Sequence, residues 1–93
     1  MPIEKAARHI LSAVADAADA LGLEIGGNDL MLTIDSKAGQ YVLNWHAPTE
    51  QLWLSSPTSG AAHYALDGAE WKNTRGGEPL EARLAHELGL AFE

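Results

Sequence analysis

The sequence predicts an α+β fold, in which an antiparallel meander sheet of five to six strands carries an N-terminal and a C-terminal helix on one face. Apolar residues recur with helical spacing over residues 3–21 and again over residues 79–88. Between them, over residues 23–74, short runs of alternating apolar and polar residues are separated by turn residues. Two amphipathic helices on one face of one sheet bury both apolar surfaces, giving a two-layer α/β sandwich whose other sheet face remains in water.

The first expected element is a helix over residues 3–21. Its apolar residues form a single stripe, made of Ile3, Ala7, Ile10, Leu11, Val14, Ala18 and Leu21. Pro2 stands where the first turn of a helix tolerates proline, and Gly22 is a suitable residue to end the helix.

Six short segments are expected to form the sheet. They are residues 23–25, 30–35, 40–44, 51–55, 61–66 and 70–74. Gly26 and Gly27 are expected to end the first strand, and Asp67-Gly68 is a strong hairpin signal before the last one. Short turns between successive strands favour meander order.

The last expected element is a helix over residues 79–88. Leu80, Leu84 and Leu88 lie on one line of this helix, and Gly89 is suited to cap it.

Length and composition predict one globular domain and exclude several classes of protein. The chain has 93 residues, 46% of them hydrophobic, with no cysteine and a net charge of −7. A disulfide framework and a thiolate site are therefore excluded, and the negative charge argues against nucleic acid and anionic membranes as partners. No apolar run reaches membrane-spanning length, and the start resembles neither a signal nor a transit peptide. We expect a bacterial cytoplasmic protein, or a mitochondrial matrix protein if the source is eukaryotic.

The strand over residues 51–55 gives the clearest functional signal. Leu52 and Leu54 alternate with Gln51, Trp53 and Ser55, so that Trp53 stands on the open face if the leucines face the helices. Tryptophan is a frequent hot spot of protein interfaces. The alternatives are a reversed register, or an indole that packs flat against its sheet neighbours.

Polar residues are expected to surround this indole. Asn44 and His46 share a face and should approach Gln51 and Trp53 across the turn, while His63 of the next strand is a further candidate. This set predicts a protein-docking patch. Two histidines could also contribute to a metal site, although a solvated histidine is the simpler interpretation.

The sequence contains no recognisable catalytic motif. Ser55, Ser56 and Ser59 lack the glycine frame of a nucleophile elbow, and neither a phosphate-binding loop nor a His-Glu-x-x-His pair occurs. We therefore expect a protein that is not an enzyme. Ferroxidase activity is the alternative left open, although it needs a tightly spaced cluster of carboxylates and histidines that the sequence does not show.

Residues 41–60, YVLNWHAPTEQLWLSSPTSG, resemble the signature of the frataxin family. That signature has an asparagine, a proline three or four residues later, then Gln-x-Trp-Leu-Ser-Ser-Pro and a glycine. Here these are Asn44, Pro48, residues 51–57 and Gly60. The resemblance extends over essentially the whole chain, including Tyr64, Asp67-Gly68 and Trp71.

The resemblance implies the frataxin fold and a role in iron–sulfur cluster assembly. Members of the family dock on a complex of a cysteine desulfurase and its scaffold protein and modulate sulfur transfer. Carried over to this chain, the sheet-surface contacts are Asn44, Gln51 and Trp53, with Pro48 shaping the turn. A monomer is expected.

The resemblance also implies weak iron binding by an acidic ridge, which here corresponds to Asp16, Asp19 and Glu24. Such sparse exposed carboxylates would hold a hard cation loosely, with water completing its shell. An iron-binding or iron-storage protein that acts through this ridge is the alternative function. A solvated helix face remains the simpler interpretation of the three residues.

The chain also departs from the family pattern. Trp45, His46, Glu50 and His63 stand at positions that are often basic or amide-bearing in relatives, and these changes are expected to remove positive charge from the docking face.

Beyond the last helix, only Leu90 and Phe92 are large apolar residues. Relatives fill the groove between the helices with a longer extension, so we expect lower stability for this chain.

Overall fold

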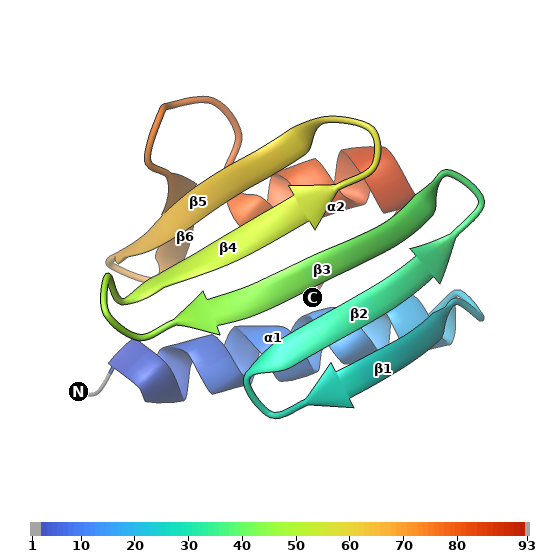
Figure 1. Cartoon of the computed structure of the whole chain (residues 1–93), viewed down its shortest axis with the longest axis horizontal. Helices are drawn as coiled ribbons and strands as arrows, with labels where there is room; N and C mark the ends of the chain where they lie inside the picture. Colours follow the sequence, from blue (N-terminus) through green and yellow to red (C-terminus); the bar gives the residue numbers. More distant parts are fainter. Residues whose placement is uncertain (1–2, 93) are drawn as a thin grey trace.

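The computed structural model describes residues 3–92 and has the fold that the sequence predicts. Its elements are α1 (Ile3–Ala20), β1 (Glu24–Asn28), β2 (Met31–Ser36), β3 (Gly39–His46), β4 (Gln51–Ser56), β5 (Gly60–Asp67), β6 (Glu70–Asn73) and α2 (Leu80–Leu88). The strands form a six-stranded sheet in the order β1-β2-β3-β4-β5-β6, and every neighbouring pair is antiparallel. Both helices lie behind the sheet in Figure 1, so the face toward the viewer is open.

The core lies between the two helices and one sheet face. The helix α1 buries the stripe Ala7, Ile10, Leu11, Val14 and Ala18, as its spacing predicts. The alternating residues of the strands supply the facing layer, which includes Leu32, Ile34, Tyr41, Leu43, Trp45, Leu52, Leu54, Tyr64 and Trp71. Each fully buried leucine or isoleucine contributes roughly 1.5–3 kcal/mol, so this layer is the main source of stability.

The first strand differs from its prediction. Instead of ending at two glycines, β1 continues through Gly26 and Gly27 to Asn28. Gly27 has φ of 107°, and a Cβ there would lie 2.1 Å from the carbonyl oxygen of Met31. Glycine is therefore needed because the β1–β2 backbones approach closely, and it does not end the strand.

The end of α2 follows its prediction. Gly89 adopts the left-handed conformation with φ of 74°, and its N–H donates a 2.9 Å hydrogen bond to the carbonyl oxygen of Ala85. Glycine reaches this conformation without a Cβ penalty, which makes it the usual residue at such a cap.

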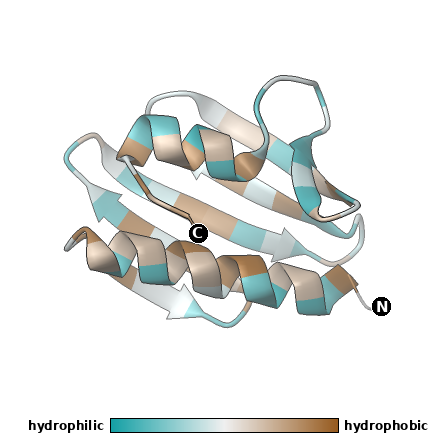
Figure 2. Cartoon of the chain, turned by 180° about the vertical axis from the view of Figure 1, so that it is seen from behind, coloured by the Kyte–Doolittle hydropathy of each residue, from teal (hydrophilic) through white to brown (hydrophobic). Residues whose placement is uncertain are grey.

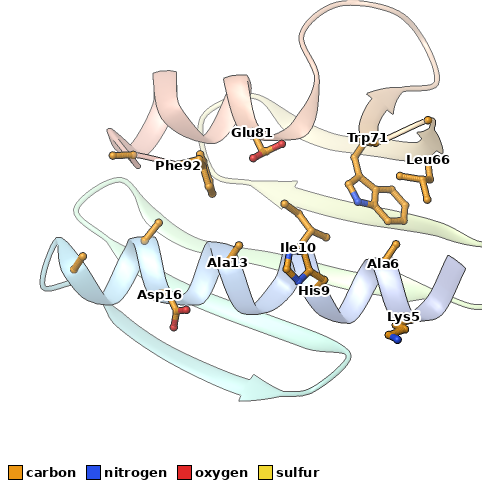
Figure 3. Close-up of a pocket in the computed structure, with 15 residues that line it drawn as sticks. Lys5, Ala6, His9, Ile10, Ala13, Asp16, Leu66, Trp71, Glu81 and Phe92 are labelled. Atoms are coloured by element: carbon orange, nitrogen blue, oxygen red, sulfur yellow. The ribbon is translucent and has the colours of Figure 1, made fainter. Parts of the chain in front are cut away.

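The segment after α2 returns between the helices (Figure 2). Leu90 is 3% exposed and belongs to the core, while Phe92 packs against the core and lines a groove of about 1060 Å³ between α1 and α2. Small residues such as Ala13 and Ala17 form much of the α1 wall of this groove (Figure 3). Leu90 and Phe92 therefore occupy part of the inter-helix space. Lower stability relative to the family stays a prediction.

Candidate functional site

The open face of the sheet gathers the residues that the sequence selected as a docking patch. Leu52 is 0% exposed and Leu54 is 2% exposed on the helix side, which excludes the reversed register. Trp53 of β4 therefore points to the open side, directly opposite Asn44 of β3 and His63 of β5.

The indole of Trp53 is stacked between two imidazoles. Its ring centroid lies 3.7 Å from that of His46, with 11° between the planes, and 4.3 Å from that of His63, with 9° between the planes. The alternative of an indole packed against its sheet neighbours is thus partly right, because Trp53 is on the open face and yet covered by these two rings. We call His46, Trp53 and His63 the ring stack.

Hydrogen bonds hold the ring stack in place. Trp53 Nε1 donates a 3.0 Å hydrogen bond to Gln51 Oε1, and His46 Nδ1 lies 2.8 Å from Thr49 Oγ1. Gln51 is itself directly opposite His46 on the neighbouring strand. The five candidate residues thus form one contiguous patch, while Thr49, which the sequence analysis did not select, supports it from the β3–β4 turn. Their role in docking stays a prediction.

The tryptophan at position 45, which departs from the family pattern, does not belong to this patch. Trp45 is 8% exposed on the helix side, where it meets Trp71 edge to face with ring centroids 6.4 Å apart. The expectation that Trp45 removes charge from the docking face is therefore wrong, because strand alternation directs this side chain into the core. His46, Glu50 and His63 remain the departures that bear on the open side.

The three carboxylates of the predicted iron site lie in different surroundings. Asp16 lines the groove between the helices, Asp19 is exposed near the end of α1, and Glu24 is exposed on β1. Within residues 3–92, no three acidic or histidine residues are grouped closely enough to hold one metal ion. The residues therefore do not fit a closed iron site. Loose binding of iron through single carboxylates and water stays a prediction.

One acidic pair was missed by the sequence analysis. Glu24 lies directly opposite Asp35 of β2, and both side chains are exposed at this edge of the open face. Like charges at directly opposed positions are destabilising, although Gln40 Nε2 donates a 3.1 Å hydrogen bond to Asp35. Only the strand register reveals the pair, because eleven positions separate the two residues in the sequence.

A second polar cluster lies on the helix side, centred on Glu87 of α2. Its carboxylate accepts hydrogen bonds from Tyr41 at 2.9 Å, Ser56 at 2.6 Å and Ser59 at 2.7 Å, and another from Thr58. Partial burial by itself would raise the pKa of Glu87, but the hydrogen bonds from these hydroxyls outweigh it and lower the pKa to about 2. We call this set the Glu87 cluster.

The Glu87 cluster joins α2 to β3, to the end of β4 and to the β4–β5 loop. Arg83, one turn earlier on α2, lies 3.7 Å from Glu87 and donates a 2.8 Å hydrogen bond to Ser59 Oγ. Both carboxylate oxygens of Glu87 thus accept hydrogen bonds from within the fold, which is typical of a structural role. The run of hydroxyl residues after β4 was the only signal for it in the sequence.

The fold and the patch define a class of protein. It is an α+β sandwich whose free sheet face carries a tryptophan stacked between two histidines. A model of the frataxin-like domain matches residues 3–93. The chain therefore belongs to the frataxin/CyaY family, as the resemblance over residues 41–60 predicted.

Relatives in sequence support this assignment. The chain is 38% identical to the mitochondrial frataxin of Dictyostelium discoideum, over 84% of this chain and 42% of that protein. It is also 38% identical to a mitochondrial frataxin-like protein of Leishmania donovani, over 91% of this chain and 52% of that protein. The chain thus spans about half the length of these curated relatives.

Solved structures show the same fold. A trimeric frataxin from the yeast Saccharomyces cerevisiae, complexed with ferrous iron, is 28% identical, with a TM-score of 0.83 over 90% of this chain and 82% of that chain. A frataxin from Psychromonas ingrahamii is 17% identical and has a TM-score of 0.77 over 98% of this chain and 92% of that chain. No helix within residues 3–92 has the length and apolar character needed to cross a membrane.

Proposed function

We propose that this chain is an iron–sulfur cluster assembly factor that docks on a cysteine desulfurase–scaffold complex and modulates sulfur transfer. Membership of the frataxin/CyaY family supports the assembly role. The observation that carries the proposal is the patch itself, in which Asn44, Gln51 and the ring stack lie side by side on the free sheet face.

The patch has the properties of an interface centre. A large indole held by a hydrogen bond and two stacked rings loses little conformational freedom when a partner covers it. The surrounding side chains are polar and partly exposed, which suits the rim of an interface. The protein acts in this proposal as a binding module and not as an enzyme.

The test is the affinity of the wild-type chain and of Trp53→Ala for a purified desulfurase–scaffold complex. We expect the variant to lose about 30-fold or more in affinity, since hot-spot truncations cost about 2 kcal/mol or more. Leu21→Ala is the matched control, because Leu21 is a large apolar residue that is 50% exposed outside the patch. Equal affinity of Trp53→Ala and wild type would refute docking through this patch, and no binding by any variant would refute the choice of partner.

Iron binding is the second candidate function. It is favoured by the ferrous complex of the yeast relative and by the position of Glu24 directly opposite Asp35, because a cation would reduce the repulsion between these two like charges. Anaerobic calorimetric titration with ferrous iron should show weak binding that falls in Asp16→Asn/Asp19→Asn or in Glu24→Gln/Asp35→Asn. Unchanged heats in both double variants would exclude these carboxylates as ligands.

Location and assembly state belong to the same proposal. A bacterial cytoplasmic location is proposed, with the mitochondrial matrix as the alternative suggested by the mitochondrial relatives. The proposed unit is a monomer, because the docking patch must remain accessible to the partner.

A further inference from the structure

We infer that Glu50 is a further contact residue of the docking patch, and that it selects a partner surface with a lysine or arginine opposite it. This inference rests on the proposed function. Glu50 lies in the turn between β3 and β4. The residue before it, Thr49, contacts His46, and the residue after it, Gln51, accepts the hydrogen bond from Trp53. Glu50 therefore borders the ring stack.

The β3–β4 turn holds Glu50 in a backbone conformation that suits glycine. The N–H of Glu50 donates a 3.1 Å hydrogen bond to the carbonyl oxygen of Ala47, which closes a four-residue turn with Pro48 in second place. Turns with proline in second place favour glycine in fourth place. Glu50 has φ of 53°, in the left-handed region, where a Cβ lies too close to a carbonyl oxygen. The turn therefore carries backbone strain at this residue.

Other residues with this kind of backbone conformation are glycines. Among residues 3–92, Glu50 is the only residue other than glycine that has a positive φ. Three other hairpins of the sheet have Gly39, Gly60 and Gly68 at φ of 134°, 83° and 65°. An observed strain of this kind is a reason to look for a function of the residue that bears it. The fold alone favours glycine at position 50, so the strain indicates a use for the Glu50 side chain outside the fold.

The Glu50 carboxylate is exposed and is not neutralised by the rest of the chain. No ion pair within residues 3–92 involves it. Lys72, which lies across β5 in the same cross-strand row as Gln51, is paired with Asp67 at 3.1 Å. A carboxylate that loses water in an interface without gaining a partner opposes binding. Docking beside the ring stack therefore requires a cationic group that faces Glu50.

The charge of the whole chain favours the same partner chemistry. The net charge of −7 attracts basic surfaces at long range. Asn44, Gln51 and Trp53 are uncharged, so Glu50 gives this part of the patch its negative charge. A charged group at the rim of an interface acts mainly on the association rate and on the choice of partner. In this arrangement the ring stack supplies contact area and Glu50 supplies selection for a basic surface.

The first experiment measures thermal unfolding of the free chain. Glu50→Gly should have a Tm equal to or above that of the wild type, because glycine removes the strain at φ of 53°. Gly68→Ala is the matched control. It places a Cβ at φ of 65° with no other heavy atom within 4 Å, so it tests the backbone conformation alone, and its Tm should fall. A Tm of Glu50→Gly that lies about 4 °C or more below the wild type would show that Glu50 stabilises the fold, and it would overturn the inference.

The second experiment measures binding to the desulfurase–scaffold complex. Glu50→Gln keeps the size of the side chain and loses its charge, so affinity should fall about fivefold, mainly through slower association that depends less on salt. Glu50→Asp keeps the charge and should bind within about twofold of the wild type, whereas Glu50→Lys should bind more weakly than Glu50→Gln. Glu81→Gln is the matched control, because it changes the net charge equally from the groove between the helices (Figure 3), and it should bind like the wild type.

The outcomes separate this inference from the proposed function. If Trp53→Ala is weakened while Glu50→Gln binds like the wild type, the contact assigned to Glu50 is wrong and docking through the patch stands. Equal losses in Glu50→Gln and Glu81→Gln would assign the effect to net charge alone, and tighter binding of Glu50→Lys would show an acidic partner surface. Either result would overturn the inference. Absence of binding by the wild-type chain would overturn the proposed function and the inference together.

Discussion

The two polar clusters of this chain, the ring stack on the open face and the Glu87 cluster on the helix side, are organised in opposite ways. In the Glu87 cluster, hydroxyls from β3, from the end of β4 and from the β4–β5 loop converge on one partly buried carboxylate of α2. In the ring stack, partly exposed side chains from three adjacent strands lie in a row on the open face. The backbones of these strands are already hydrogen-bonded to one another in the sheet. The Glu87 cluster therefore contributes to stability, whereas the ring stack leaves its rings available to a partner.

The largest expected effect is on stability, through Glu87. Glu87→Ala removes the common acceptor of Tyr41, Ser56, Thr58 and Ser59, and partly buried hydroxyls left unsatisfied are costly. We expect a loss of about 2–3 kcal/mol in the free energy of unfolding, with a fall in Tm of roughly 10 °C or more. Thermal and denaturant unfolding measure this change. A loss below about 0.5 kcal/mol, the range of ordinary surface substitutions, would contradict a structural role for the cluster.

The acid dependence of stability should report the same cluster. The pKa of Glu87 is lowered in the folded chain from 4.5 to about 2, so its contribution is complete above about pH 4.5 and is lost as the pH falls toward 2. We expect roughly 2–3 kcal/mol of stability to be lost over this window. Glu87→Gln, which does not titrate, should show a shallower acid dependence. Parallel curves for wild type and Glu87→Gln would contradict the assigned pKa.

The smallest expected effect concerns the groove between the helices, which belongs to neither cluster. Ala13 lines this groove of about 1060 Å³, and a leucine at this position would cover part of its apolar wall (Figure 3). We expect Ala13→Leu to raise the free energy of unfolding by about 1 kcal/mol, with no change in docking. Asp19→Leu, on an exposed position of the same helix, is the control and should not stabilise. A destabilised Ala13→Leu chain would mean that the groove cannot accept the added volume.

The sequence predicted the sheet, both helices and the open-face position of Trp53, because these follow from local periodicity. The Leu52 and Leu54 alternation fixes which side of β4 is buried, and that single feature orients the whole strand. The resemblance over residues 41–60 added the family, which the frataxin-like domain match confirms.

Features that depend on long-range packing were not predicted. Glu87 gains its partners from residues 28 to 46 positions away, and no local pattern marks such convergence. The stacking of His46 and His63 on Trp53 requires both the register and the ring orientations. The carboxylates Asp16 and Glu24 were grouped by resemblance, whereas the fold separates them between a helix groove and a sheet edge.

Docking through the open face is tested most directly by comparing Trp53→Ala with Glu87→Gln in two assays, unfolding and binding to the desulfurase–scaffold complex. We expect Trp53→Ala to lose about 30-fold or more in affinity while its stability changes by about 1 kcal/mol or less. Glu87→Gln should show the reverse, with lower stability and unchanged affinity at a temperature where it is folded. If Trp53→Ala bound like the wild type, or if Glu87→Gln lost affinity as strongly, the assignment of docking to the open face would be wrong.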